Sequence, residues 1–237
     1  MKKLSGSTVR RNFTLVELLV VIAIMGILMF IGLPAFEKLA KGSGTELAAR
    51  NLTSKLGQAR GYAVTIREYV AVLMPTTAAE GASSAKLPND YIFRGYKLCV
   101  VSTTSTAGEF TFKRWLPSEK WEFMPAGTAI NHINAAPHAL GSDSDSTTGT
   151  WTAAAVTDKV DGVILSEIGT PKYDTVDNVR AIVFKPAGKM AVNGNRCVAV
   201  SESTYSGTGT TPTSTNKKNW IDITVDQFTG RVAYGSE

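Results

Sequence analysis

Residues 13–36 read FTLVELLVVIAIMGILMFIGLPAF, an apolar segment with a single acid, Glu17, near its start. Residues 18–36 carry no charge, which makes an uncharged run of 19 residues. A helix rises about 1.5 Å per residue, so this run spans roughly 28 Å, close to the roughly 30 Å hydrocarbon core of a bilayer. Soluble core helices rarely continue so far without a polar residue, and we therefore expect a membrane-spanning helix.

A short basic leader precedes this segment. It holds Lys2, Lys3, Arg10 and Arg11 and no acid, so the positive-inside tendency predicts that the leader stays in the cytoplasm while the rest of the chain lies outside. A secretory signal would have a shorter apolar region, of about 7–15 residues, and then a small-residue cleavage site. This run is longer and lacks such a site at its end, so we expect the helix to be kept as an anchor.

Glu17 is the unusual residue of the segment. A carboxylate inside a membrane helix costs a few kcal/mol and is usually functional and paired. The alternative is that Glu17, four residues from the start of the segment, lies at the level of the lipid headgroups and needs no partner. The physics of the residues alone leaves both readings open.

Residues 11–24, RNFTLVELLVVIAI, resemble the N-terminus of type IV pilins and type II secretion pseudopilins. In that family a membrane peptidase cuts before the Phe and methylates the new N-terminus, which implies processing between Asn12 and Phe13. The resemblance further implies that Glu17 pairs with the N-terminal ammonium of a neighbouring subunit during assembly. Pro34 matches the family's proline at which the helix bends or melts. One residue departs from the family, because Asn12 stands where Gly is usual.

Three further segments resemble the H-type minor pseudopilins and their type IV pilus counterparts. These are ARGYA at residues 59–63, the turn at residues 184–188, and TGRV at residues 229–232. The resemblance is loose here and strong only over about 25 residues at the N-terminus.

Most of the net positive charge of the chain lies in the leader. The net charge is +5, and the leader holds four of the 25 Lys and Arg residues. Residues 13–237 therefore keep 21 basic against 20 acidic residues, a net charge of +1. No cluster of basic and aromatic residues remains, so nucleic acid is not indicated as a partner.

The predicted helix continues beyond the apolar run, to about residue 65. Ala48, Leu52, Leu56, Ala59 and Ala63 recur at spacings of three and four, which predicts an amphipathic helix with one face on a core. We expect its opposite face to carry Arg50, Asn51, Ser54, Lys55, Gln58 and Arg60. Two glycines, Gly42 and Gly44, predict a bend or short break between the halves.

After residue 65 the pattern changes to strands. Segments 67–74, 91–102, 109–116, 121–124, 162–165, 180–185, 220–225 and 231–234 read as strands, with a turn at 184–190 and hairpins at 91–116 and 220–234. Residues 76–88, 135–150 and 203–218 read as loops. We expect an α+β, pilin-like fold with a long N-terminal helix on an antiparallel β-sheet domain. Its parts are a cleaved leader (1–12), a transmembrane helix (13–36), an amphipathic continuation (37–65) and an exported β domain (66–237).

Few residues suggest site chemistry. Cys99 and Cys197 lie in apolar, strand-like contexts and could form a disulfide on the oxidising side of the membrane or remain two buried thiols. His132 and His138 read as surface loop histidines rather than zinc ligands. GSDSDS at residues 141–146 lacks the spacing of a calcium loop. Trp115, Trp121, Trp151 and Trp220 read first as core residues and second as a binding surface. We expect no metal, no cofactor and no enzymatic activity.

The resemblance implies a structural role. It points to a subunit, of the minor type in that family, of a type II secretion pseudopilus or type IV pilus. Its partners would be other pilin or pseudopilin subunits, prepilin peptidase and an inner-membrane assembly platform. It implies a single pass through a bacterial inner membrane, with the C-terminal domain in the periplasm or in an extracytoplasmic fibre. The alternative is a membrane-anchored periplasmic binding module for a protein, a glycan or DNA.

Overall fold

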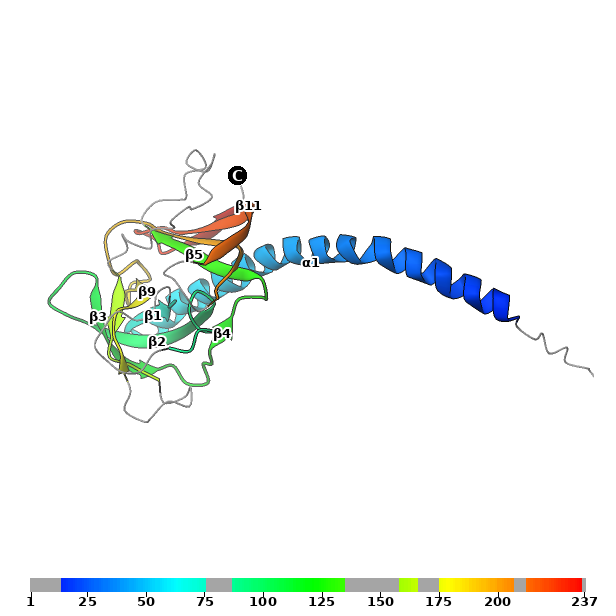
Figure 1. Cartoon of the computed structure of the whole chain (residues 1–237). Helices are drawn as coiled ribbons and strands as arrows, with labels where there is room; N and C mark the ends of the chain where they lie inside the picture. The colour runs from blue at the N-terminus through cyan, green and yellow to red at the C-terminus, as the bar shows by residue number, and fades with distance from the viewer. Residues whose placement is uncertain (1–13, 76–86, 135–157, 166–174, 207–211, 236–237) are drawn as a thin grey trace, which may run out of the picture. The chain divides into compact units, whose positions relative to one another are not determined.

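The computed structural model describes residues 14–75, 87–134, 158–165, 175–206 and 212–235 (Figure 1). Within these ranges, the side chains of residues 31–43, 132, 134 and 215–218 lie outside the description. The chain divides into two compact units, Met1–Ala40 and Lys41–Glu237. Each unit is described by itself.

One helix, α1, spans Leu15–Ile66 and agrees within one residue with the predicted end near residue 65. Of the bend or short break expected at the two glycines, the break is wrong, because the helix continues through residues 41–44. Each glycine costs a helix up to about 1 kcal/mol, and the packing that begins with the buried Thr45 and Ala48 offsets that cost. Among the residues that the structure describes, no helix is both long enough and apolar enough to cross a membrane.

The predicted apolar stripe of α1 is confirmed. Its five residues are completely buried: Ala48, Leu52, Leu56, Ala59 and Ala63. The residues predicted to face water are exposed with one exception, since Lys55 is only 4% exposed. The prediction for Lys55 was wrong because its ammonium forms ion pairs with two carboxylates of the β domain, those of Glu119 and Glu122.

Five strands of the first sheet close into a ring. The sheet contains β1 (Tyr69–Leu73), β2 (Gly95–Thr103), β3 (Glu109–Trp115), β4 (Glu122–Phe123), β6 (Lys159–Asp161) and β9 (Val179–Phe184). Its order is β1-β9-β6-β3-β2-β4, and the additional pairing of β1 with β2 closes the ring. The β3–β6 pairing is parallel, so the expected purely antiparallel sheet is wrong at this one place among the pairings of the described strands.

Strand alternation divides the apolar side chains of this ring between two cores. Ala71, Cys99, Phe110, Val160 and Ala181 belong to one cluster, to which all five strands of the ring contribute. The alternate residues of β1, β2 and β9 belong to a second cluster, which includes the buried stripe of α1. Side chains on a strand point to opposite faces in turn, so these three strands are buried on both sides.

The second sheet supplies the rest of the core around α1. It contains β5 (Thr128–Asn134), β10 (Arg196–Thr204), β11 (Thr213–Val225) and β12 (Val232–Gly235), in the order β12-β11-β10-β5. Ile130, Val198, Val200 and Ile223 from this sheet join the cluster that holds the helix stripe. A further pair, β7 (Val163–Ile164) and β8 (Thr175–Val176), forms a two-stranded sheet.

The predicted hairpins and turn are confirmed. Strand β2 pairs antiparallel with β3, and β11 pairs antiparallel with β12. The turn after β9 closes with a bridge between Phe184 and Met190. The loop expected at 203–218 is wrong at residues 203–204 and 213–218, because the first two end β10 and the others begin β11. The loop at 135–150 lies outside the described residues, as does most of the loop at 76–88.

Candidate functional site

The described part of the first unit begins with a capping box. Glu17 donates its backbone N–H to the Thr14 hydroxyl at 3.2 Å. In return the Glu17 carboxylate accepts the backbone N–H and the hydroxyl of Thr14, both at 3.3 Å. A Thr and a Glu three residues apart satisfy two donors of a helix end reciprocally, and the carboxylate also favours the positive end of the helix dipole. The side chain of Glu17 is thereby held at the first turn of α1.

An apolar surface follows directly on this cap. Residues 15–30 contain 13 exposed large apolar side chains, with exposed fractions from 45% at Val21 to 84% at Leu15. Glu17 is the one charged residue in this stretch. Burying one Leu, Ile, Val or Phe side chain is worth about 1.5–3 kcal/mol, so an apolar surface of this extent indicates contact with lipid or with other apolar helices.

The other residues predicted for this site are only partly described. Asn12 and Phe13 lie outside the described residues. Pro34 lies within α1, whose helical backbone continues through that position, and its side chain is outside the description. The structure therefore describes the geometry of Glu17 but not that of the processing position.

The two cysteines are buried thiols on different sheets. Cys99 lies on β2 and Cys197 on β10, and no disulfide joins them. Of the two alternatives that the sequence left open, the structure has the one without a bridge. Burial raises the pKa of the Cys99 thiol above its ordinary value, which keeps it protonated and unreactive at neutral pH.

The histidines and tryptophans are divided among strands, core and undescribed segments. His132 belongs to β5 rather than to a loop, with its side chain outside the description, and His138 lies outside the described residues. Trp115 and Trp121 are partly buried against the cluster to which all five strands of the ring contribute, as their interpretation as core residues predicts. The centroids of their aromatic rings lie 6.0 Å apart. Trp220 lies half-buried on β11, and Trp151 is not described. In the described ranges, no group of three or more His, Cys, Asp or Glu side chains could hold a metal ion.

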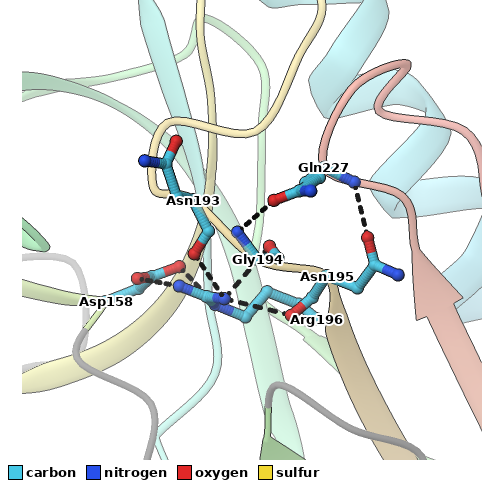
Figure 2. A network of polar contacts seen from close by, with 6 residues as sticks. All are labelled: Asp158, Asn193, Gly194, Asn195, Arg196 and Gln227. Atoms are coloured by element: carbon cyan, nitrogen blue, oxygen red, sulfur yellow. Dashed lines mark hydrogen bonds and ion pairs between the residues drawn. The ribbon is translucent and has the colours of Figure 1, made fainter.

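A buried ion pair that the sequence did not reveal joins the two sheets (Figure 2). Asp158 precedes β6 and is completely buried, and Arg196 begins β10 with 3% exposure. The guanidinium donates to both carboxylate oxygens, from Nε at 2.9 Å and from Nη2 at 2.8 Å. Burial raises the pKa of the Asp158 carboxyl, although the Arg196 guanidinium opposes this shift. No spacing rule relates two residues this far apart, so only the fold brings them together.

A second ion-pair cluster, around the buried Lys55, connects α1 to Glu119, which lies between β3 and β4, and to Glu122 of β4. The Lys55 ammonium lies 2.6 Å from a Glu119 carboxylate oxygen and 2.7 Å from one of Glu122. Burial by itself would lower the pKa of Lys55, but the hydrogen bonds to the two carboxylates outweigh it and raise this pKa above its ordinary value. This contact fixes the helix to the β domain at a position that the helix pattern assigned to solvent.

Two of the segments that carry the loose resemblance meet at the helix. Arg60 donates from Nε to the backbone carbonyl of Gly188 at 3.1 Å. Gly188 has a φ of 74° and Gly230 a φ of 63°, both in the left-handed region that favours glycine. A Cβ atom at Gly230 would overlap the carbonyl oxygen of Gly188. The turn after β9, the turn before β12 and the helix are thus in close contact.

Comparison with known proteins gives a limited likeness. No protein-family model and no curated protein matches the sequence. Two crystal structures of the type IV minor pilin FimU of Pseudomonas aeruginosa, strain PAO1, are similar to this chain at 13% sequence identity. The crystal form P21 gives a TM-score of 0.39 and covers 81% of this chain and 87% of that chain. The crystal form P65 gives a TM-score of 0.36 and covers 80% of this chain and 91% of that chain. Likeness at these TM-scores does not decide the function of this chain.

Proposed function

We propose that this chain is a structural subunit, of the minor pseudopilin type, of a type II secretion pseudopilus or a type IV pilus. The observation that carries the proposal is the exposed apolar surface of residues 15–30 with Glu17 as its one charged residue. Other pilin or pseudopilin subunits would cover this surface in a fibre. We assign the chain no enzymatic activity.

In this proposal, Glu17 sets the register between neighbouring helices. An apolar surface can slide along another at little cost, because apolar contacts carry no direction. A single carboxylate in that surface is costly unless it meets a positive group, so it selects the one position that provides such a group. The N-terminal ammonium of a neighbouring processed subunit would supply that charge. The capping box keeps the carboxylate at the end of the helix, where such an ammonium would arrive.

We further propose that the chain is anchored in a bacterial inner membrane by one pass, with its leader in the cytoplasm. The support is the uncharged sequence from residue 18 to 36 together with the basic leader. Residues 31–36 of that run lie outside the described side chains. Prepilin peptidase and an inner-membrane assembly platform would be its partners during maturation.

Processing can be tested directly on the purified protein. Cleavage before Phe13 predicts a mature chain that begins with a methylated Phe, which N-terminal sequencing and intact mass would detect. Co-expression with an inactive peptidase is the control and should leave the leader in place. A mature chain that begins at Met1 in the presence of active peptidase would contradict the proposal.

The assembly role is tested with Glu17→Ala. We expect the variant to enter the membrane normally but to form much less fibre, measured by shearing and immunoblotting against the membrane fraction. The matched control is Glu46→Ala, which removes an exposed acid from the same helix. The Oε1 atom of Glu46 lies 2.5 Å from Nη2 of Arg50. Wild-type amounts of fibre from Glu17→Ala would refute the register role.

Thr14→Ala separates the charge of Glu17 from its capping function. This variant removes the hydroxyl of the capping box and costs about 1 kcal/mol of helix stability, yet it leaves the carboxylate available to a neighbour. We expect fibre formation to fall less than in Glu17→Ala. An equal fall in both variants would assign the effect to helix capping. Capture of a soluble ligand by a chain that never joins a fibre would favour the alternative of a tethered binding module.

A further inference from the structure

The loop before β10 contains a chemically labile side-chain amide, that of Asn193. Asn193-Gly194 is the one Asn-Gly pair in the 237 residues of the sequence. In such a pair the backbone nitrogen of the second residue can attack the side-chain carbonyl carbon of the first, because glycine has no Cβ to hinder the approach. Asn193 is exposed, and its side-chain amide takes part in none of the contacts drawn in Figure 2.

The nucleophile of this reaction is engaged in the folded protein. The backbone N–H of Gly194 donates to Oε1 of Gln227, in the turn between β11 and β12 (Figure 2). Gln227 is itself held in place, because its backbone N–H donates to Oδ1 of Asn195 at 2.9 Å and its carbonyl accepts the backbone N–H of Met190 at 3.2 Å. A nitrogen whose proton is donated to an acceptor loses that proton less readily, and its lone pair is not directed at the neighbouring side chain.

The rest of the loop is fixed by the guanidinium of Arg196. Its Nη1 donates to three successive backbone carbonyls, those of Asn193 at 3.4 Å, Gly194 at 3.1 Å and Asn195 at 3.0 Å. Gly194 adopts a φ of 99°. The backbone on either side of the Asn193–Gly194 peptide is therefore held in one conformation, and rotation of Asn193 toward the Gly194 nitrogen is opposed by these contacts.

We propose that Asn193 is a site of spontaneous deamidation and that the side chain of Gln227 restrains the reaction. When the restraint opens, the Gly194 nitrogen gives up its proton to water, and its electron pair forms a bond to Cγ of Asn193. The bond from Cγ to the side-chain amide nitrogen breaks, this nitrogen takes up a proton from water and leaves as ammonia, and a cyclic imide remains. Water then opens the ring at one of its two carbonyls and yields aspartate or isoaspartate. The net reaction consumes one water and releases one ammonia, with no change in oxidation state.

The product bears directly on the ion pair that joins the two sheets. Deamidation places a new carboxylate three residues from Arg196, whose guanidinium already donates hydrogen bonds to Asp158 and to the three loop carbonyls. Isoaspartate also inserts a methylene into the backbone and displaces the carbonyls that Nη1 binds. An exported protein that has aged in this way would differ from a new one at the contact between β6 and β10.

The test follows deamidation of the full-length protein in detergent during incubation at mildly alkaline pH, with peptide mass spectrometry at Asn193 as the readout. We expect slow reaction in the folded wild type and fast reaction in the urea-unfolded chain. Gln227→Ala should accelerate the reaction in the folded protein about fivefold, the factor that corresponds to the roughly 1 kcal/mol net contribution of one hydrogen bond. Asn195, which precedes the bulky Arg196, is the internal comparison and should remain intact over the same period.

Gln227→Glu is the matched control, because its carboxylate offers an oxygen at the place of the Gln227 amide oxygen, which accepts the Gly194 N–H. We expect this variant to deamidate at the wild-type rate. If Gln227→Ala unfolds the turn, faster hydrogen exchange at the backbone amide of Asn195 would report it. The deamidation rate of Gln227→Glu then still tests the proposal. Equal rates at Asn193 in folded and unfolded wild type, or a Gln227→Glu variant as fast as the unfolded chain, would overturn the proposal.

Discussion

Removing the carboxylate of Asp158 should destabilise the β domain severely. In Asp158→Asn the guanidinium of Arg196 keeps its three carbonyl contacts but loses the negative charge of its partner and one of the two oxygens that accept its hydrogen bonds. The side chains of the pair are 0% and 4% exposed, so water cannot replace the lost partner. Breaking a buried pair at one side costs about 3–5 kcal/mol. For a domain of this size the corresponding fall in Tm is about 6–20 °C.

The assay is urea or thermal unfolding of the full-length protein in detergent, monitored by circular dichroism. The control is Glu46→Gln, which breaks the pair with Arg50, where the side chains are 52% and 62% exposed. Exposed pairs of this spacing contribute about 0.3–0.5 kcal/mol. A loss below about 1 kcal/mol in Asp158→Asn, similar to the control, would refute the reasoning that burial gives this pair its weight.

Three further predictions concern the helix contact, a turn and the thiols. The pKa of Lys55 is raised in the folded state. The stability from its two carboxylate partners is therefore fully present below the ordinary lysine pKa and is lost as the pH rises through the raised pKa. Unfolding curves measured at increasing alkaline pH should show this loss for the wild type and not for Lys55→Met. Gly230→Ala should destabilise the domain strongly, because its Cβ would overlap a backbone carbonyl, whereas Gly57→Ala, with open space around its Cβ, should be neutral or stabilising by up to about 1 kcal/mol in the same melts. Cys99 and Cys197 should react with a thiol reagent only after unfolding, since both are buried, and fast labelling of the native protein would contradict the fold at these positions.

Local patterns predicted what depends on local geometry. The spacing of Ala48, Leu52 and Leu56 located the buried face of α1, because side chains three and four apart share one side of a helix. The hairpins were found because turn residues separate two strand-like runs. The capping box was also present in the sequence, as Thr14 and Glu17 three residues apart, and this signal was overlooked.

The remaining features depend on contacts that sequence spacing cannot locate. Lys55 has the polarity of a surface residue and is buried because Glu119 and Glu122, more than 60 residues away, meet it. Strands β6 and β8 have only three and two residues, too few to show a periodic pattern. The first half of β11 is polar throughout, and only its position beside β10 makes it a strand. In each case a distant part of the chain overrides the local preference.

The closed ring of five strands limits how copies of this domain can meet. Each of β1, β2, β3, β6 and β9 has a strand partner on both sides, although β6 pairs with only the first three residues of β3, Glu109–Thr111. Among the described strands, open sides remain at the ends of the second sheet, at β4, and in the two-stranded sheet. A fibre would hold many such domains at high local concentration, where open strand edges promote irreversible aggregation. In a fibre of the proposed kind, contacts through the paired parts of the ring would therefore be made by side chains, and such contacts can also be released.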